Sequence, residues 1–307
     1  MKISYVVTSY NKAPFLEDTL SSIAAERQSS GGEIVIVDDG STDDSRAILA
    51  RFTASNPDAK IVAQANRGVA AASNVGFRHS EHAAIRFCDA DDILCTGSSR
   101  VLLEALASTG AGVAFGRHET YRSKPDSLAV DTAALLATLV EDPLRQALTR
   151  NLFSPSSTIM ARRVAEQILP LPEHFCTSQD YMMAVRACFC AQIARIETVL
   201  SVGPETHGNR LSADLGRMYG ETAAFLSEEI RGGSGSWRRG DTSYALKRNA
   251  GRALLWSRRN DPRPQETLKL LALKHFARWH DRETAARELA WIAKTVYRVE
   301  AGQAPIR

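Results

Sequence analysis

Two short acidic runs carry the side chains best suited to chemistry in this sequence. Asp89, Asp91 and Asp92 stand within four residues, and Asp38 and Asp39 stand together upstream. Hard divalent cations prefer oxygen ligands, and Mg²⁺ is commonly held by one or two carboxylates together with phosphate oxygens. In an extended segment Asp89 and Asp91 point to the same side. The runs therefore indicate a site for a cation and a phosphate-bearing ligand, although an acidic turn that caps a helix also fits the D-x-D spacing.

Each acidic run follows a segment with the composition of a buried strand. Such strands are predicted at residues 3–8, 33–38 and 83–88, with a shorter one at 60–64, and helical patterns lie between them. Strands that alternate with helices at this spacing predict a parallel sheet with right-handed crossovers. Ligands of such sheets bind beyond the carboxyl ends of the strands, which is where both acidic runs fall.

Beyond residue 97 the pattern is less regular. We expect helices at 100–108, 132–149 and 179–190, and strands at 112–116, 156–161 and 193–202. The segment GGSGS at 232–236 has the composition of a flexible linker. It predicts a boundary between a domain at 1–230, with halves 1–100 and 101–230, and a helical extension at 231–307. That extension has helical patterns at 242–259, 264–279 and 281–299.

The distribution of charge separates the same two parts. Residues 1–230 carry 21 Lys and Arg against 28 Asp and Glu, and residues 231–307 carry 17 against 7, within totals of 38 and 35. All four tryptophans lie in the basic part. The five cysteines show no C-x-x-C pair, which favours a reduced, cytoplasmic chain. No apolar run reaches the length of a transmembrane helix, and no signal peptide is predicted.

Four segments in order resemble the family 2 glycosyltransferases of the GT-A fold. They are VVTSYN (6–11), IVIVDDGSTD (34–43), NRGVAAASNVG (66–76) and FCDADD (87–92), which together cover roughly residues 3–100. The resemblance implies an α/β fold with a mostly parallel, Rossmann-like sheet flanked by helices. It also implies a metal-dependent, inverting transfer of a sugar from a nucleotide-diphosphate donor to an acceptor hydroxyl in glycan, lipid-linked glycan or glycoconjugate biosynthesis. UDP is the expected nucleotide, with dTDP and GDP open.

The resemblance also implies roles for individual residues. The nucleotide-binding set is Thr8, Tyr10, Asn11, Asp39, Asn66, Gly68, Asn74 and Asp89, in which Asp39 contacts the base and Asp89 the ribose. Asp91 is expected to bind Mg²⁺ or Mn²⁺. His207, in a late HGNRLS segment, is expected to approach the metal or the diphosphate, although it also fits an ordinary polar loop.

The general base of such enzymes usually lies in an E-D pair in the second half. Here the pair is Gln179-Asp180 at the start of a helical run, so Asp180 is the candidate base, although a carboxylate at a helix N-terminus is also simply stabilising there. A second departure is Ser73, because the third block of the family usually has an arginine at that position. Arg67 or Arg78 would then have to supply the cation.

The basic extension allows several partners. It is expected to pack as a small helical subdomain, to contact a membrane peripherally on the inner face, or to steer an anionic acceptor. No nucleic-acid-binding motif is present. Two other functions remain open: a nucleotidyltransferase, which would need a glycine-rich loop that residues 8–14 lack, and a non-catalytic scaffold that acts through its basic tail. The phosphate-loop pattern G-x-x-x-x-G-K-[ST] is absent as well.

Overall fold

A computed structural model describes residues 1–125, 128–130, 136–205, 214–232 and 235–299. The chain divides into two compact units. Unit 1 comprises residues 1–141, 153–173 and 190–206, and unit 2 comprises residues 142–152, 174–189 and 207–307. Two stretches of unit 2 thus interrupt unit 1 in the sequence.

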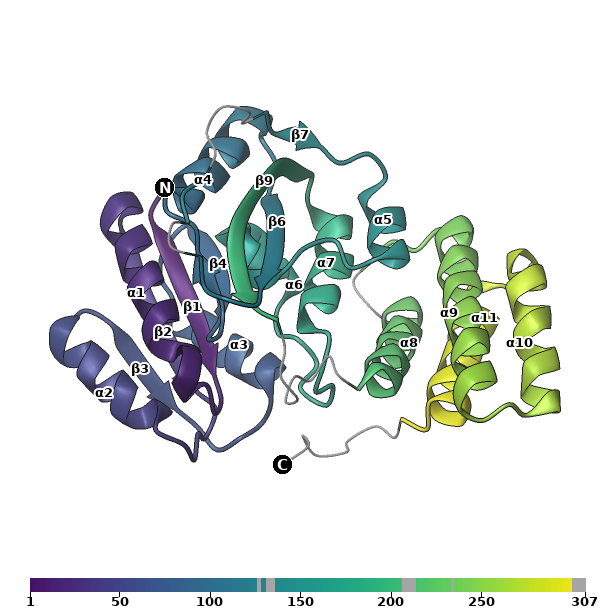
Figure 1. Cartoon of the computed structure of the whole chain (residues 1–307). Helices are drawn as coiled ribbons and strands as arrows, with labels where there is room; N and C mark the ends of the chain where they lie inside the picture. The colour runs from purple at the N-terminus through teal and green to yellow at the C-terminus, as the bar shows by residue number, and fades with distance from the viewer. Residues whose placement is uncertain (126–127, 131–135, 206–213, 233–234, 300–307) are drawn as a thin grey trace. The chain divides into compact units, whose positions relative to one another are not determined.

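Unit 1 is built on a mixed sheet in the order β3-β2-β1-β4-β8-β6-β9-β5, and β7 pairs with β9 (Figure 1). The strands are β1 (Ile3–Ser9), β2 (Gly32–Asp38), β3 (Lys60–Ala63), β4 (Ala84–Asp89), β5 (Ile93–Leu94), β6 (Val113–Tyr121), β7 (Thr138–Leu139), β8 (Thr158–Ala161) and β9 (Ile193–Pro204). The first four are parallel, whereas β8 runs antiparallel to both β4 and β6. The expected parallel sheet is therefore confirmed for the N-terminal strands, and β8 reverses the direction after them.

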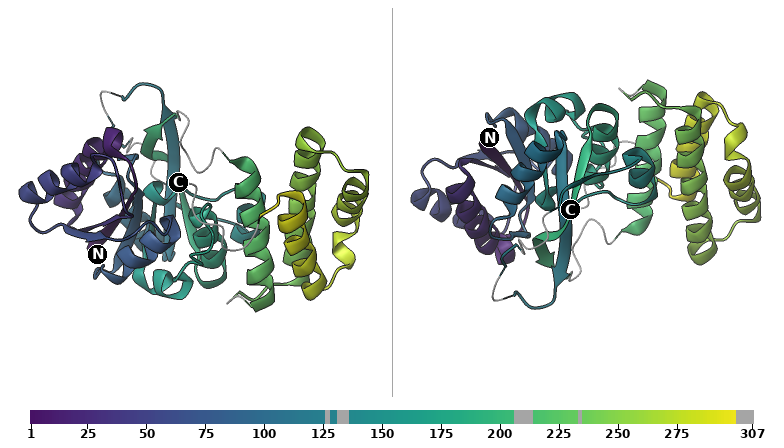
Figure 2. Two further views of the ribbon diagram at one scale, coloured as in Figure 1. Left: turned by 90° about the horizontal axis from the view of Figure 1, so that it is seen from below. Right: turned by 90° about the horizontal axis from the view of Figure 1, so that it is seen from above.

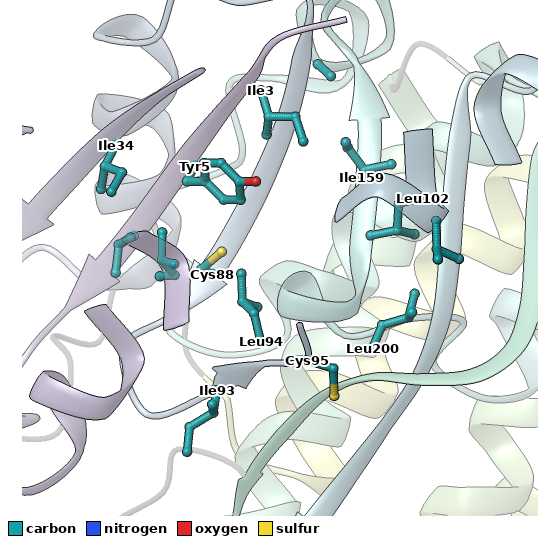
Figure 3. Packing of buried hydrophobic residues seen from close by; sticks show 14 of the residues in the cluster. Ile3, Tyr5, Ile34, Cys88, Ile93, Leu94, Cys95, Leu102, Ile159 and Leu200 are labelled. Atoms are coloured by element: carbon teal, nitrogen blue, oxygen red, sulfur yellow. The ribbon is translucent and has the colours of Figure 1, made fainter. Parts of the chain in front are cut away.

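The helices of unit 1 are α1 (Ala13–Ser30), α2 (Ser45–Ser55), α3 (Val69–Arg78), α4 (Ser98–Thr109) and α6 (Arg162–Ile168), with a 3₁₀ turn η1 at Pro155–Ser157. Side chains on alternate positions of a strand lie on opposite faces of the sheet. Ile3 and Tyr5 of β1 accordingly lie in one apolar cluster with Leu102 of α4 (Figure 3). On the other face, Val37 packs against Ala72 and Val75 of α3.

Gly76 explains how α3 approaches the sheet so closely. A Cβ atom at this position would lie 2.3 Å from Cγ1 of Val6 and 3.2 Å from Cγ2 of Val37. Any larger residue would push α3 away from β1 and β2. The glycine that ends the third sequence block therefore serves helix packing.

Unit 2 is helical. It contains α5 (Pro143–Thr149), α7 (Gln179–Cys190), α8 (Leu215–Gly232), α9 (Arg239–Asn260), α10 (Pro264–Phe276), α11 (Arg282–Trp291), the 3₁₀ turn η3 (Ala277–Trp279) and the π-turn η4 (Ile292–Val296). Helix α9 contacts both α10 and α11, and α11 also packs on α8. The two views of Figure 2 show these C-terminal helices side by side. Phe225, Leu246, Leu270 and Leu289 are fully buried in the unit.

Several expected elements differ from the structure. The helix expected at 132–149 is wrong over most of its length, because residues 138–139 form β7 and helix α5 spans only Pro143–Thr149. Asp142 caps α5 by accepting a hydrogen bond from the backbone of Arg145, and Pro143 fixes its first turn. Residues 132–135 lie outside the described residues. Strand β5 and helix α8 were not predicted.

The three C-terminal helices expected at 242–259, 264–279 and 281–299 correspond to α9, α10 with η3, and α11 with η4. Within the described residues, none of the helices combines the length and apolar character that crossing a bilayer requires. The five cysteines all lie in the described part of the chain, where Cys88, Cys95 and Cys176 are buried and Cys188 and Cys190 are half-buried.

Candidate functional site

The register of the sheet brings the acidic runs to one edge. Ser9 at the end of β1 pairs with Asp38 of β2, and Thr8 pairs with Asp89 of β4. Because β2, β1 and β4 are parallel, their carboxyl ends lie at the same edge, as the sequence predicted. We call this edge, with the segments that follow the three strands, the acidic rim: residues 8–12, 38–46 and 89–92.

Asp39 is buried beyond the end of β2 and holds the loop between β3 and α3. Its carboxylate accepts hydrogen bonds from Nε2 of Gln64 at 2.7 Å and from the backbone N–H groups of Arg67 and Gly68, both at 2.8 Å. Burial raises the pKa of Asp39 above its usual value, and the three hydrogen bonds oppose that shift. The carboxylate therefore fixes the position of residues 64–68 beside the rim.

Gly40 allows this loop to lie against the end of β2. Its φ is +80°, and a Cβ atom there would lie 2.9 Å from the backbone nitrogen of Asn66 and 3.2 Å from the carbonyl oxygen of Gln64. Only glycine combines that left-handed conformation with such close contact. The DDGS segment after β2 is thus in close contact with the loop after β3.

Three buried polar atoms near these loops have no hydrogen-bond partner among the described residues. They are Oγ of Ser9, Oε1 of Gln64 and Oδ1 of Asn66. Buried polar groups in proteins are nearly always paired, and an unpaired one calls for an explanation such as a bound ligand or water. These three unpaired atoms lie at the end of β1 and directly after β3. They indicate that this end of the sheet binds a polar ligand.

Asn11 shapes the rim through its side chain. It adopts φ +52°, and its Oδ1 accepts hydrogen bonds from the backbone nitrogens of Thr42, at 2.8 Å, and Asp43, at 3.3 Å. Its own backbone nitrogen donates to Oγ of Ser41. Asn11 thus ties the segment after β1 to the segment before α2. Thr8 and Tyr10, its neighbours in the first block, are half-buried.

Asp91 already has a cationic partner. Nζ of Lys12 lies 2.5 Å from Oδ2 of Asp91, whose side chain is 11% exposed. Carboxylate oxygens are also the ligands that a hard divalent cation prefers, and the metal-binding role of Asp91 remains a prediction. No group of three or more His, Cys, Asp or Glu side chains with the geometry of a metal site occurs among the described residues. A divalent ion here would need oxygen ligands from its phosphate-bearing partner or from water.

The backbone of Asp89 is anchored to the interior of the sheet. Its N–H donates to Oγ of Ser156 at 3.1 Å, and the carbonyl oxygen of Ser156 accepts two hydrogen bonds from Arg86, at 3.0 Å and 2.6 Å. Arg86 is fully buried in β4, and its guanidinium also donates to the hydroxyls of Ser98 and Ser99. The backbone of Asp89 is therefore connected through Ser156 to the hydrogen-bond network of the buried Arg86.

Asn74 is engaged by the protein itself. Its side-chain amide exchanges two hydrogen bonds with the backbone of Leu171, at 2.9 Å and 2.7 Å, and donates to Glu173. Arg67 pairs with Glu173 as well. These contacts join the third sequence block to residues 171–173, and the assignment of Asn74 to the nucleotide remains a prediction.

Asp180, the candidate base, belongs to unit 2 and lies in the first turn of α7. Asn151 donates a hydrogen bond to its Oδ2, and the backbone N–H of Tyr181 donates to Oδ1 at 2.8 Å. Burial raises the pKa of Asp180, which these hydrogen bonds partly offset. A carboxylate with a raised pKa is suited to accept a proton near neutral pH.

A buried glutamate fixes the turn that leads into α7. Glu221 of α8 accepts hydrogen bonds from the backbone nitrogens of Cys176 and Thr177, at 3.0 Å and 2.7 Å, and from Nε of Arg217. Asp180 is thus placed by a rigid turn inside unit 2. His207 lies outside the described residues, so its expected role stays a prediction.

Sequence reasoning missed three residues of this arrangement: Lys12, Gln64 and Ser156. Lys12 directly follows the first sequence block, so its place beside the rim could have been predicted from the end of the strand. Nothing in the local sequence marks Gln64 or Ser156, because their partners Asp39 and Asp89 are 25 and 67 residues away.

Comparison with known proteins gives three kinds of similarity. The family model described as "Glycosyl transferase family 2" matches residues 4–169. An uncharacterized glycosyltransferase of Nostoc is 31% identical over 178 residues, which are 56% of this chain and 54% of that protein. The chain thus spans about half the length of this curated relative.

Solved structures share the fold. TarS 1–349 of S. aureus in complex with UDP-GlcNAc superposes with a TM-score of 0.68 at 16% identity, over 94% of this chain and 90% of that one. The mannosyltransferase PcManGT of Pyrobaculum calidifontis, in complex with GDP-Man and Mn²⁺, gives 0.57 at 18% identity, over 97% and 88%. At these identities the similarity shows the fold alone, and it confirms the expected α/β architecture of the GT-A type.

Proposed function

Because the chain belongs to glycosyltransferase family 2, we propose that it transfers a sugar from a nucleotide-diphosphate donor to an acceptor hydroxyl. The observation that carries this proposal is the acidic rim, where Asp39, Asp89 and Asp91 gather beside the unpartnered polar atoms of Ser9 and Asn66. The rim offers carboxylates for a cation and buried polar groups for a nucleotide.

UDP is the proposed nucleotide. A structural neighbour binds UDP-GlcNAc, and another binds GDP-Man, so GDP is the natural competitor to test. Oδ1 of Asn66 and Oε1 of Gln64 are acceptors without partners, which suits a base or ribose that presents N–H or O–H donors. Asp39, which positions both, acts on the nucleotide through this loop or by direct contact.

Asp91 would hold Mg²⁺ or Mn²⁺, which when bound neutralises the charge that develops on the leaving diphosphate, and Asp89 would contact the ribose. The Mn²⁺ in the complex of the mannosyltransferase supports a divalent ion in this role. The protein's own part is to hold residues 89–91 in place, through the anchored backbone of Asp89 and a hydrogen bond from Thr19 of α1 to the carbonyl oxygen of Ala90.

The proposed reaction inverts the configuration of the sugar. The acceptor oxygen attacks the anomeric carbon, a new carbon–oxygen bond forms, and the bond to the donor's phosphate oxygen breaks on the opposite side. The nucleoside diphosphate leaves with the bonding electron pair. The carboxylate of Asp180 takes the proton of the acceptor hydroxyl, for which its raised pKa suits it.

We also propose glycans, lipid-linked glycans or other hydroxyl compounds as acceptors, and a peripheral place at the inner membrane face. Helix α10 and η3 carry an exposed apolar row at spacings of four, four and three residues: Leu268, Ala272, Phe276 and Trp279, called here the α10 stripe. Arg278 and Lys274 flank the row. A helix with an apolar stripe, an aromatic end and basic flanks has the features of an interfacial membrane contact.

Thermal unfolding with UDP, GDP and dTDP, each with and without Mn²⁺, tests the donor site. A ligand at about 100 times its Kd stabilises by roughly 2.7 kcal/mol. For a domain of this size the midpoint shifts about 2–4 °C per kcal/mol. We expect a Mn²⁺-dependent shift with UDP that Asp91→Ala abolishes, followed by release of UDP from UDP-sugars when acceptor is added. A protein that shifts with none of the three nucleotides would be a scaffold.

A further inference from the structure

Lys12 occupies a position that the proposed chemistry has not used. It follows β1 and precedes α1, and its backbone is fixed at both ends. Its N–H donates to Oγ of Ser45 at 3.0 Å, and its carbonyl oxygen accepts from the backbone nitrogens of Phe15 and Leu16 at 2.9 Å and 3.0 Å. The side chain alone is free to move, and it is 28% exposed. Lys12 can therefore change partners without any change in the fold.

The present partner of Lys12 is the carboxylate that a divalent ion requires. With 2.5 Å between Nζ and Oδ2, the ammonium group occupies the space next to Asp91 where such an ion would be coordinated. Two cations this close to one carboxylate repel each other strongly at the edge of a protein interior. Binding of a divalent ion to Asp91 must therefore displace the ammonium of Lys12.

Two other cations near the rim are already paired with carboxylates. Arg46 pairs with the buried carboxylate of Asp38 at 3.0 Å, and Arg67 pairs with Glu173. Neither needs to leave its partner when a divalent ion binds. Lys12, in contrast, must leave its partner when the ion binds. In the proposed reaction the ion binds together with the diphosphate of the donor. An ammonium on a flexible stem is a good point-charge ligand for phosphate oxygens.

We propose that Lys12 is an exchangeable cation of the acidic rim: it neutralises Asp91 while no divalent ion is bound, and it binds the donor's diphosphate once Asp91 has taken the ion. This inference rests on the proposed nucleotide-diphosphate donor. It makes the two binding events mutually dependent, because the ion releases Lys12 for the diphosphate and the diphosphate holds Lys12 away from Asp91. Such reciprocity is a thermodynamic requirement of linked sites.

The exchange of Lys12 for a divalent ion at Asp91 can be tested without any sugar transfer by measuring the affinity for Mn²⁺. The electron paramagnetic resonance signal of the unbound ion reports how much Mn²⁺ the protein has bound. In the absence of nucleotide, Lys12→Met should bind Mn²⁺ at least about tenfold more tightly than the wild type, since the competing charge is gone. Lys12→Arg keeps the charge and should stay near the wild-type affinity. With Mn²⁺ at a saturating concentration, Lys12→Met should bind UDP about three- to tenfold more weakly, because the ammonium group that binds the diphosphate is gone.

Lys124→Met is the matched control. Lys124 also lies 2.5 Å from a carboxylate of unit 1, Asp18, but this pair is about half exposed and is not part of the rim. Its removal should leave the Mn²⁺ affinity unchanged. An equal gain in Lys124→Met would mean that net charge and not contact governs the affinity, and it would overturn the inference. Unchanged Mn²⁺ affinity in Lys12→Met would overturn it as well.

The same proteins separate this inference from the proposed function. Tighter Mn²⁺ binding in Lys12→Met together with no sugar transfer by the wild type would overturn the proposed transferase activity and leave the exchange at Asp91 standing. Sugar transfer by the wild type together with unchanged Mn²⁺ affinity in Lys12→Met would overturn only the exchange.

Discussion

The side-chain amide of Asn151 donates a hydrogen bond to the carboxylate of Asp180, and both residues belong to unit 2. Burial raises the pKa of Asp180, and the bond from Asn151 is one of the contacts that lower it again. The protonation of the proposed base is thus set by two opposing effects, of which one can be removed by a single substitution.

The first prediction concerns the pH dependence of transfer. A base must be deprotonated, so activity falls as the pH drops through the pKa of Asp180. Asn151→Ala removes a contact that lowers this pKa, so the acid limb of the kcat/KM profile should move to higher pH. The profile measured across the acidic and neutral range checks this expectation. An acid limb that stays in place, or moves to lower pH, would contradict the role of Asp180.

Asp180→Asn separates binding from chemistry. The substitution keeps the size of the side chain but removes its ability to take a proton, so transfer should fall by about 10²- to 10⁴-fold. Donor binding should be unchanged, because the nucleotide site is assigned to residues of unit 1. The thermal shift with UDP and Mn²⁺ measures the second effect on the same protein sample. Full transfer activity in this variant would assign the base to another residue.

Gly40→Ala should weaken nucleotide binding. The added Cβ would lie 2.9 Å from the backbone nitrogen of Asn66, so residues 64–66 must move, and with them the unpartnered oxygens of Gln64 and Asn66. We expect a loss of UDP affinity of about tenfold or more, measured by calorimetry, together with lower stability from the strained φ.

Gly110→Ala is the control for this strain. Gly110 also has a positive φ, +68°, but a Cβ atom there would meet nothing within 4 Å. It should lower the unfolding temperature to a similar degree and leave UDP affinity intact. Equal losses of affinity in both variants would show that the effect comes from general destabilisation and not from the loop beside Asp39.

The α10 stripe predicts binding to anionic membranes. The full chain should co-sediment with vesicles that contain phosphatidylglycerol, more weakly at high salt because surface charges are screened. The double substitution Phe276→Ser with Trp279→Ser should abolish most of this binding, since it removes the largest apolar side chains of the stripe.

Leu255→Ser is the matched control, because Leu255 is similarly exposed, at 59%, but lies on α9. Retained vesicle binding in the double variant would argue against the stripe as the membrane contact. A change of oligomeric state in the double variant, seen by size exclusion, would instead point to a second copy of the chain as the partner of the stripe.

The N-terminal half of the fold could be predicted because its signals are local. Strands β1, β2 and β4 are mostly apolar, although Arg86 interrupts β4, and each ends at the polar residues that form the rim. In the later half, α4, β6, β8, α7 and β9 were predicted close to their observed positions. The place of β8 in the sheet was not predicted, because β8 lies between β4 and β6 through pairing with strands far away in the sequence. No periodicity within 100–230 encodes that reversal.

The candidate site divides in the same way. Asp39, Asp89 and Asp91 were placed at one edge from the strand ends alone. The contact of Lys12 with Asp91 spans 79 residues, and that of Asn74 with Leu171 spans 97. Such contacts depend on tertiary packing, and a single sequence does not indicate which distant residues will be in contact.

The hydrogen bonds beneath Asp89 have a consequence for how the rim responds to a ligand. Ser156 links the backbone of Asp89 to the fully buried Arg86, so the position of Asp89 is tied to the interior of the sheet. The amide of Asp89 should then exchange its hydrogen with solvent as slowly as the centre of the sheet does. Around Asp89 the acidic rim would then unfold only together with the sheet of unit 1. A ligand would therefore bind to a surface that is already ordered.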